Sequence, residues 1–214
     1  MIPDALFLDF DGVICDTERA ARLSWEELYA CLGLEFPPAL WAQMVGRPDG
    51  ESLAVADLSR RHARAQWQSL LSWRRSRKEE LADAEPALPG VIQLMDTAED
   101  LGIRLAVVSS SSAAWVGRHL RRTGLYSRLS FVITREDVRC CKPAPDPYVT
   151  ALGRAGLEPG AAVAFEDSPP GIRAAAAAGI RCVAVRGPGQ AIALPQADLV
   201  LDSLDAFDFR WLAT

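Results

Sequence analysis

The chain contains little lysine, little histidine and no long apolar run. Lys78 and Lys142 are the only lysines among its 23 basic residues (Lys and Arg), and its formal net charge is −5 at pH 7. Nucleic acids and anionic membrane surfaces are bound by basic faces, which this charge balance does not indicate. The longest apolar runs, such as residues 161–165, are far shorter than the roughly 18 residues of a membrane-spanning helix. We therefore expect no nucleic-acid partner and no membrane association.

The sequence also shows neither a pattern of paired cysteines nor the features expected of an export signal. The five cysteines are odd in number and form no Cys-x-x-Cys motif, which argues against a disulfide framework and a zinc knuckle. Residues 1–4 carry no basic stretch of the kind that opens a secretory signal. We expect a reducing, cytoplasmic location, and a protein that is a monomer or a weak homodimer.

The residues that are present predict an α/β protein. Of the 214 residues 50% are apolar and 24% charged, which excludes a disordered or collagen-like chain. Short aliphatic runs recur, each followed by a turn and a helical pattern, and such runs are typical of strands buried on both faces of a parallel sheet. The predicted fold is a doubly wound parallel-sheet, Rossmann-like core. The predicted strands are Ala5–Phe10, Arg104–Val108, Phe131–Thr134, Ala162–Phe165, Arg181–Val185 and Leu199–Leu201.

One long helical segment interrupts this alternation. Between the first predicted strand and Pro89 the sequence has helical periodicity, no convincing strand and four of the six tryptophans. Because such a segment is too long for a crossover between parallel strands, we predict a second, all-helical domain over residues 17–84. The α/β core then comprises residues 1–16 and 85–214. The basic run at residues 74–78 fits a solvated helix face better than an anion site.

Two carboxylates follow the first predicted strand. Asp9 and Asp11 alternate at its carboxyl end and are followed by Gly12. Ligands of open α/β sheets bind at this edge of the sheet. Two buried like charges are costly unless a cation or a shared proton compensates, and Mg²⁺ is the simplest cation because it prefers hard oxygen ligands. A solvated strand end with two incidental acids is the alternative.

Other strand ends carry polar residues of the same kind. Glu166 and Asp167 repeat the acidic pair before a helix, although Asp167 alone can equally be a helix cap. Ser109 begins a run of serines where hydroxyls and helix N–H groups favour an anion, with simple capping by Ser112 as the alternative. Lys142 precedes another helix turn, and in a chain rich in arginine a lysine indicates that a compact point charge is needed, unless it is a surface residue. The four predicted strand ends carry Asp9 and Asp11, Ser109, Lys142, and Glu166 and Asp167.

These segments resemble the four motifs of the haloacid dehalogenase-like superfamily of phosphohydrolases, in order and over essentially the whole chain. The resemblance is carried by DFDGVICDTE, the strand end at Ser109, CKPAPDPY and FEDSPPGIRAAAAAGI. With a helical insertion after the first strand, these forms are similar to the branch that holds phosphoglycolate-type phosphatases and beta-phosphoglucomutase. The resemblance implies a Mg²⁺-dependent phosphatase that hydrolyses a small phosphorylated metabolite through an aspartyl-phosphate. True dehalogenases of the superfamily lack the second aspartate, so Asp11 favours phosphoryl transfer.

The resemblance also implies a role for each motif residue. Asp9 is the expected nucleophile and Asp11 the expected general acid and base. Lys142 is expected to neutralise Asp9 beside the phosphoryl group, and the sequence permits a cis bond before Pro143. The expected ligands of Mg²⁺ are Asp9, Asp11 through its backbone carbonyl, Asp167, and Glu166 nearby or through water. The expected ligands of the phosphoryl oxygens are Ser109, Ser110 and Lys142.

The helical domain corresponds in this resemblance to the family's cap, which closes over the site and selects the leaving group. Gly46-Arg47 resembles the cap loop that faces the substrate. Arg47 is therefore the candidate specificity residue, with a surface role as the alternative.

Two other functions stay open. A sugar-phosphate phosphomutase passes the aspartyl-phosphate to a second hydroxyl instead of water, and the related mutase uses a histidine where this chain has Ala21. This difference favours the phosphatase, since His62 and His119 lie outside the motifs and are expected to be structural. A binding or regulatory protein with an inactive site is the third possibility, which hydrolysis of p-nitrophenyl phosphate would exclude. Sugar phosphates, phosphoglycolate and nucleotides all remain open as substrates.

Overall fold

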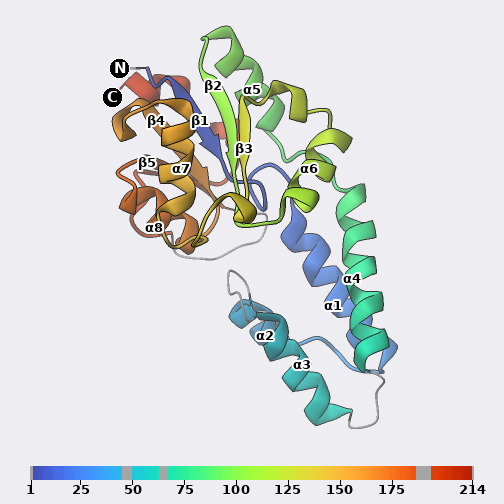
Figure 1. Ribbon diagram of the computed structural model, residues 1–214. Helices are drawn as coiled ribbons and strands as arrows, with labels where there is room; N and C mark the ends of the chain where they lie inside the picture. Colours follow the sequence, from blue (N-terminus) through green and yellow to red (C-terminus); the bar gives the residue numbers. More distant parts are fainter. Residues whose placement is uncertain (1, 45–49, 63–66, 187–193, 214) are drawn as a thin grey trace. The chain divides into compact units, whose positions relative to one another are not determined.

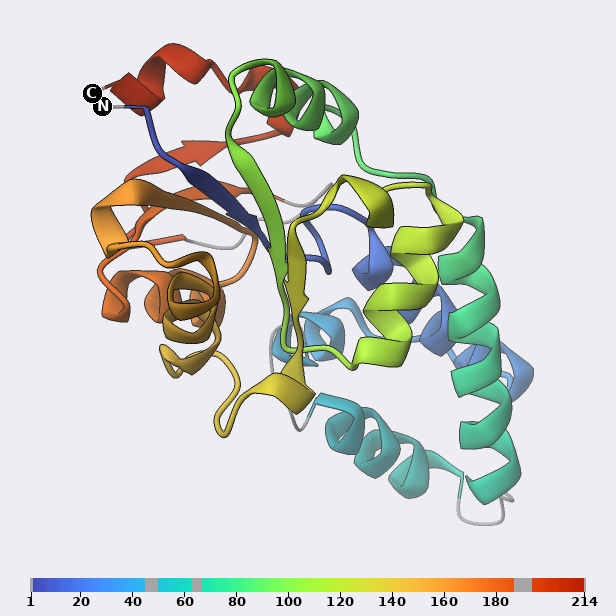
Figure 2. The same cartoon turned by 45° about the horizontal axis from the view of Figure 1, so that its top comes forward.

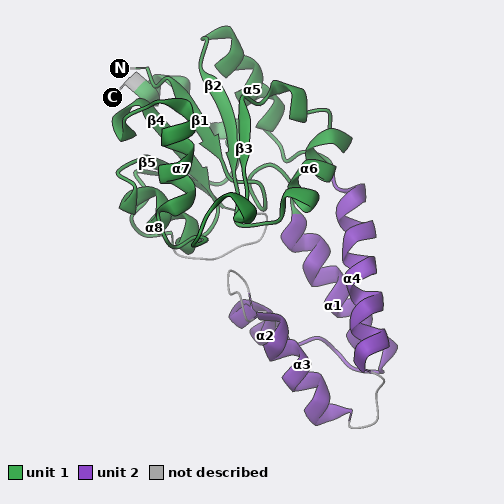
Figure 3. Cartoon of the chain, in the orientation of Figure 1, with its two compact units in different colours: residues 1–16, 86–214 green, residues 17–85 purple. Residues whose placement is uncertain are grey.

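The structure, a computed structural model, describes residues 2–44, 50–62, 67–186 and 194–213 (Figures 1 and 2). The chain divides into two compact units, one of residues 1–16 and 86–214 and one of residues 17–85 (Figure 3). Among the helices in the described ranges, none combines the length and the apolar character that crossing a membrane takes.

The first unit is built on a six-stranded sheet whose neighbouring strands are all parallel. The strand order is β3-β2-β1-β4-β5-β6, so β1 lies between β2 and β4. Leu8 at the end of β1 is in register with Val107 and Phe165 on these two neighbours. The predicted α/β fold class is thereby confirmed. The strands are β1 (Ala5–Leu8), β2 (Arg104–Val108), β3 (Phe131–Ile133), β4 (Ala162–Glu166), β5 (Arg181–Val185) and β6 (Leu199–Leu201).

Helices cover both faces of this sheet, because successive strand residues point to opposite sides. Leu6 and Leu8 belong to an apolar core with α5 and α6, whereas Ala5 and Phe7 belong to a second core with α7 and α8. The two helix layers can be followed in Figures 1 and 2. The helices are α5 (Val91–Asp100), α6 (Ala113–Arg122), α7 (Asp146–Ala155) and α8 (Pro169–Ala177), and the 3₁₀ segments are η1 (Tyr126–Arg128), η2 (Arg135–Asp137), η3 (Pro159–Ala161), η4 (Leu204–Ala206) and η5 (Phe209–Ala213).

Serine side chains fix the starts of two helices that follow central strands. At the start of α6 the Ser112 Oγ accepts a hydrogen bond from the backbone N–H of Trp115 at 3.3 Å. At the start of α8 the Ser168 Oγ accepts one from the N–H of Gly171 at 3.2 Å. Ser112 is therefore the N-cap of α6, whereas the Ser111 hydroxyl donates to Asp11.

The described residues of the second unit pack around aromatic side chains. Trp25 and Tyr29 are both buried, and the Arg74 guanidinium lies over the Trp25 ring at 4.4 Å while it pairs with Glu51. The prediction of a solvated face is wrong for Arg74, which is 2% exposed, because its partners come from other helices. The helices of this unit are α1 (Thr17–Cys31), α2 (Pro38–Met44), α3 (Gly50–Arg61) and α4 (Trp67–Ala84).

Candidate active site

The site lies where the central strands end. The backbone N–H of Asp9 donates to the carbonyl of Phe165 at 2.9 Å, and the N–H of Ser109 donates to the carbonyl of Ile133 at 3.0 Å. The backbone ladder therefore continues one residue beyond β1 and beyond β2. Because parallel strands end at the same edge, Asp9, Ser109 and Glu166 are held at neighbouring positions by backbone bonds rather than by loops.

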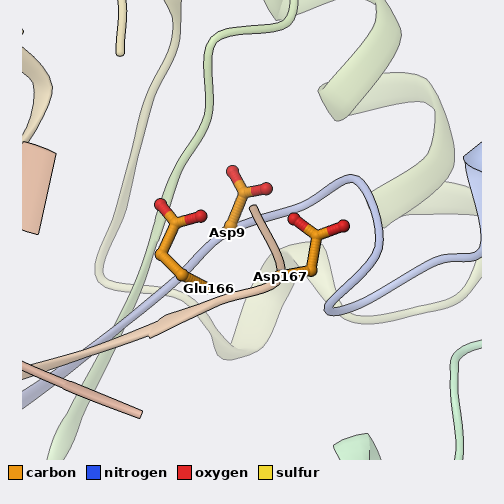
Figure 4. Close-up of side chains that lie close together, drawn as sticks. All are labelled: Asp9, Glu166 and Asp167. Carbon is orange, nitrogen blue, oxygen red and sulfur yellow. The ribbon is translucent and has the colours of Figure 1, made fainter. Parts of the chain in front are cut away.

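Three carboxylates meet at this edge. Asp9 follows β1, Glu166 is the last residue of β4, and Asp167 follows it; Figure 4 shows the three side chains gathered together. One oxygen from each lies within 4.8 Å of the other two. Their residues are 7%, 0% and 7% exposed, so the negative charges are concentrated in a buried space. The predicted meeting of the two acidic pairs across neighbouring strand ends is what the structure shows for these three residues.

Two glycines make room for the carboxylates. A Cβ on Gly12, whose φ is 85°, would lie 2.0 Å from Oδ2 of Asp167. A Cβ on Gly171 would lie 1.8 Å from Oε2 of Glu166. Both approaches are far inside van der Waals contact, so each carboxylate occupies the volume that any other residue type would fill.

Lys142 brings a positive charge into the cluster. Its Nζ lies 2.7 Å from Oδ1 of Asp9, 2.6 Å from Oε1 of Glu166 and 2.7 Å from the carbonyl oxygen of Val108. Its side chain is 5% exposed. Its backbone N–H donates to Oγ of Ser110 at 3.2 Å, and the Lys142–Pro143 bond is cis.

The position of Lys142 corrects the prediction that this residue lies at a strand end. β3 ends at Ile133, and the chain passes through η2 before it reaches Lys142, which lies in the loop ahead of α7. Lys142 is therefore not at a strand end. A long side chain from a loop reaches the cluster, whereas the acidic residues are placed by the sheet itself.

The electrostatics of the cluster follow from its burial. Burial raises the pKa of Asp9 to about 7; Lys142 opposes this rise and Glu166 adds to it. Burial alone would lower the pKa of Lys142, but the charges of Asp9 and Glu166 raise it above its usual value. Tyr148, whose pKa burial raises well above normal, donates its O–H to Oε1 of Glu166 at 2.5 Å. Lys142 therefore stays charged, while burial makes Asp9 bind a proton more readily than an ordinary aspartate does.

Asp11 is oriented by donors of its own. Its Oδ1 accepts a hydrogen bond from the indole Nε1–H of Trp115 at 3.0 Å, and its Oδ2 accepts one from the hydroxyl of Ser111. Both donors belong to the segment that follows β2. The sequence analysis did not single out Trp115; its place one turn into a helix that follows an expected anion site is the signal that could have found it.

The remaining predicted residues fall into three groups. Ser109 directly follows β2, is 1% exposed, and its Oγ accepts a hydrogen bond from the backbone N–H of Ser111 at 3.0 Å; its contact with a phosphoryl group stays a prediction. Ser110 lies beside Lys142 through the bond given above. His119 is buried with its ring 4.3 Å from that of Trp115, which agrees with a structural role. Arg47 lies outside the described residues.

Comparison with known proteins gives the chain a family. A family model described as haloacid dehalogenase-like hydrolase matches residues 3–179. The chain belongs to this family. Validoxylamine A 7'-phosphate phosphatase of Streptomyces hygroscopicus subsp. limoneus is 31% identical over 211 residues, which cover 97% of this chain and 95% of that protein. Hexitol phosphatase A of Escherichia coli (strain K12) is 31% identical over 207 residues, which cover 92% and 89%.

A solved structure agrees over nearly the whole chain. The crystal structure of CbbY from Rhodobacter sphaeroides in complex with phosphate has a TM-score of 0.74, with 29% sequence identity and 96% of each chain covered. The predicted membership of the haloacid dehalogenase-like hydrolases is confirmed. The predicted enzyme class, a phosphatase, is confirmed as well by relatives of that name.

Proposed function

We propose that this protein is a magnesium-dependent phosphatase that acts on a small phosphorylated metabolite, with Asp9 as the nucleophile. The observation that supports this proposal most is the buried cluster in which Asp9 contacts Lys142 and lies beside Glu166 and Asp167. A carboxylate paired with a fixed cation is suited to attack a phosphorus atom, because the cation also attracts the incoming phosphate.

The donor set of the cluster fits a hard divalent cation. Three buried carboxylates offer oxygens within 4.8 Å of one another, and hard oxygen ligands of this kind are what Mg²⁺ prefers. We propose that Asp9, Asp167 and the backbone carbonyl of Asp11 hold Mg²⁺, with Glu166 nearby or bridged by water because its Oε1 already accepts from Lys142 and Tyr148. When bound, Mg²⁺ would neutralise and orient the substrate phosphate.

The protein's own residues account for the proton and phosphoryl transfers. Asp9 forms a bond to phosphorus as the bond to the leaving oxygen breaks, and Asp11 gives its proton to that oxygen. Asp11 then takes a proton from the water that attacks the aspartyl-phosphate, which frees phosphate and restores Asp9. Lys142 stays charged throughout and holds a phosphoryl oxygen. The hydroxyls of Ser109 and Ser110 are proposed as further donors to the phosphoryl group, since a hydroxyl can donate while its oxygen accepts.

For the substrate class we propose a phosphorylated sugar or sugar alcohol. This choice is supported by the relatives named for validoxylamine A 7'-phosphate and for hexitols. The helical unit of residues 17–85 is proposed to serve as the cap that selects the leaving group, and Arg47 remains the candidate residue for that selection.

Phosphate release is the direct test of this function. The wild-type protein and the Asp9→Asn variant are incubated with a panel of hexose, hexitol and pentose phosphates, phosphoglycolate and nucleotides, each with Mg²⁺ and with EDTA. We expect Mg²⁺-dependent release from at least one sugar or sugar-alcohol phosphate, and none from Asp9→Asn. Release that persists in EDTA or in Asp9→Asn would contradict the metal and nucleophile assignments, and release confined to nucleotides would contradict the substrate class.

A further inference from the structure

Trp115 contacts the carboxylate of Asp11 through an N–H group that can only donate a hydrogen bond. The indole Nε1–H lies 3.0 Å from Oδ1. An indole nitrogen can donate a hydrogen bond and cannot accept one. Because the carbonyl oxygen of a carboxylic acid is a better acceptor than its hydroxyl oxygen, this hydrogen bond favours the state in which Oδ1 carries no proton.

The other oxygen of Asp11 has a partner of a different kind. Oδ2 is bonded to the hydroxyl of Ser111. A hydroxyl both donates and accepts, so it can donate to an ionised Oδ2 and accept from a protonated one by rotating about its C–O bond. Trp115 and Ser111 are thus chemically unequal, since Trp115 favours the unprotonated state of Oδ1 whereas Ser111 can bond to either state of Oδ2.

The Trp115 ring packs against the buried ring of His119. It packs edge-on against the ring of His119, one helical turn later, with centroids 4.3 Å apart and an interplanar angle of 70°. The His119 ring lies 5.8 Å from that of Phe10, the residue directly before Asp11. His119 and Phe10 are 0% and 1% exposed. The indole is therefore braced against the same short segment whose carboxylate it contacts, which fixes the direction of its N–H bond.

We propose that Trp115 is a positioning residue for the acid–base step, and that it confines the catalytic proton of Asp11 to Oδ2. This inference rests on the proposed role of Asp11. In the first half-reaction the O–H bond at Oδ2 breaks and its proton bonds to the leaving oxygen, as that oxygen separates from phosphorus. In the second, a water O–H bond breaks, its proton returns to Oδ2, and the water oxygen bonds to phosphorus as Asp9 leaves. The indole N–H remains on Oδ1 in both halves.

A pair of matched substrates separates acid catalysis from other effects. Phenyl phosphate has a poor leaving group that needs a proton, whereas p-nitrophenyl phosphate has a similar shape and a leaving group that departs without one. For Trp115→Phe, which keeps a ring and loses the donor, we expect kcat/KM on phenyl phosphate to fall about tenfold or more, and kcat/KM on p-nitrophenyl phosphate to fall less than about threefold, because a misplaced acid loses part of its usual 10²–10⁴-fold contribution. The rates compared are kcat/KM values, because hydrolysis of the aspartyl-phosphate also uses Asp11, is common to both substrates and can limit kcat.

The control is Trp211→Phe, the same substitution at a ring that packs near Phe207 and Arg181. It is expected to leave the ratio of the two rates at the wild-type value. Equal losses on both substrates in Trp115→Phe, or a ratio no different from that of Trp211→Phe, would overturn the inference. Asp11→Asn is measured alongside: if it does not depress the phenyl phosphate rate selectively, the proposed role of Asp11 itself fails, which distinguishes the two conclusions.

A double-mutant cycle supplies an independent measurement. If Trp115 acts through Asp11, then Trp115→Phe in the Asp11→Asn background causes no further selective loss, whereas additive losses would contradict the proposal. Should Trp115→Phe fail to fold, replacing Trp115 by β-(3-benzothienyl)alanine keeps the fused double ring and removes the N–H donor. The same change in the ratio of phenyl to p-nitrophenyl phosphate rates is then expected, and an unchanged ratio would refute the proposal.

Discussion

Lys142 Nζ lies 2.7 Å from Asp9 Oδ1 although 133 positions separate the two residues in the chain. The same nitrogen is within hydrogen-bond distance of Glu166 and of the carbonyl of Val108. An ammonium group has three N–H donors, and here three oxygens on different segments surround it. This arrangement joins the loop ahead of α7 to the ends of β1, β2 and β4, so Lys142 holds the site together as well as balancing its charge.

The first prediction concerns Lys142→Arg. A planar guanidinium cannot direct donors at three oxygens arranged around one nitrogen, so one partner is displaced. We expect kcat/KM to fall by about 10²-fold or more, the loss typical when one preorganised donor to a developing charge is removed. Lys78→Arg is the matched control, because Lys78 is the only other lysine and belongs to the helical unit; it is expected to keep wild-type activity. Wild-type kcat/KM in Lys142→Arg would count against the site.

The second prediction separates the two aspartates of the first motif. Asp9→Asn and Asp11→Asn are both expected to lower steady-state turnover by about 10²-fold or more, but for different reasons. Without the Asp9 carboxylate no phosphoenzyme forms. Without Asp11 a good leaving group such as p-nitrophenolate still departs and leaves an aspartyl-phosphate that hydrolyses slowly. Rapid-quench measurement with p-nitrophenyl phosphate should show a burst for Asp11→Asn and none for Asp9→Asn. A burst in Asp9→Asn would assign the nucleophile elsewhere.

The acidic half of the site could be predicted from the sequence because the sheet itself places it. The apolar runs of β1 and β4 were recognisable, and parallel strands end at one edge, so Asp9 and Glu166 were expected at the same edge of the sheet; the structure adds that these two strands are neighbours. Lys142 reaches the cluster from a loop, whose path depends on packing that spacing does not encode. The donors to Asp11 were hidden for a similar reason: Trp115 has a helical spacing that is equally typical of a core residue.

The burial of Arg74 in the second unit could not be predicted from the sequence for a similar reason. The Arg74 side chain lies against Trp25 and pairs with Glu51, two residues from other helices. Periodicity describes one helix at a time and assigns a basic run to the solvent side. The buried guanidinium follows from the packing of three helices together, which the sequence alone did not reveal.

The third prediction uses a glycine against which a carboxylate packs. Gly171 and Gly153 both lie in helices, but a Cβ at Gly171 would meet Glu166 at 1.8 Å, while one at Gly153 meets no heavy atom of the other described residues within 4 Å. We expect Gly171→Ala to destabilise the protein by about 1–3 kcal/mol through overpacking and to lower activity by displacing Glu166. Gly153→Ala is expected to stabilise by about 0.5–1 kcal/mol. Urea unfolding measures both, and equal midpoints would contradict the close approach.

The fourth prediction concerns pH and the metal. An unfolded Asp ionises near pH 4, whereas burial raises the pKa of Asp9 to about 7 in the metal-free fold. Folding therefore takes up a proton between about pH 4 and pH 7, and the contribution of Asp9 to the free energy of unfolding falls as pH rises through this window. A divalent cation binds the ionised carboxylate and displaces that proton.

Added Mg²⁺ should consequently raise the urea midpoint more at about pH 8 than at about pH 5, relative to EDTA. The gain approaches about 2.7 kcal/mol when Mg²⁺ is a hundredfold above its Kd. Asp167→Asn is the control and is expected to lose most of the gain at both pH values. A Mg²⁺ effect that does not change with pH would show that Asp9 is not a ligand.

The last prediction separates hydrolysis from phosphoryl transfer to a sugar. The mutase that the chain resembles uses a histidine shortly after the first motif, and here that position is Ala21 of α1, whose methyl group neither donates nor accepts a hydrogen bond. The two histidines of the chain are at positions 62 and 119, and the second is buried against Phe10 and Trp115. A site without that group has less means of holding a sugar hydroxyl, in place of water, in line with the phosphoenzyme.

We therefore expect the protein, incubated with beta-glucose 1-phosphate, Mg²⁺ and a trace of glucose 1,6-bisphosphate, to release free phosphate faster than it forms glucose 6-phosphate. Coupled assays for the two products decide the matter, because glucose 6-phosphate appearing first would identify a mutase, whereas phosphate release from a phosphomonoester without isomerisation is the result that a phosphatase must give.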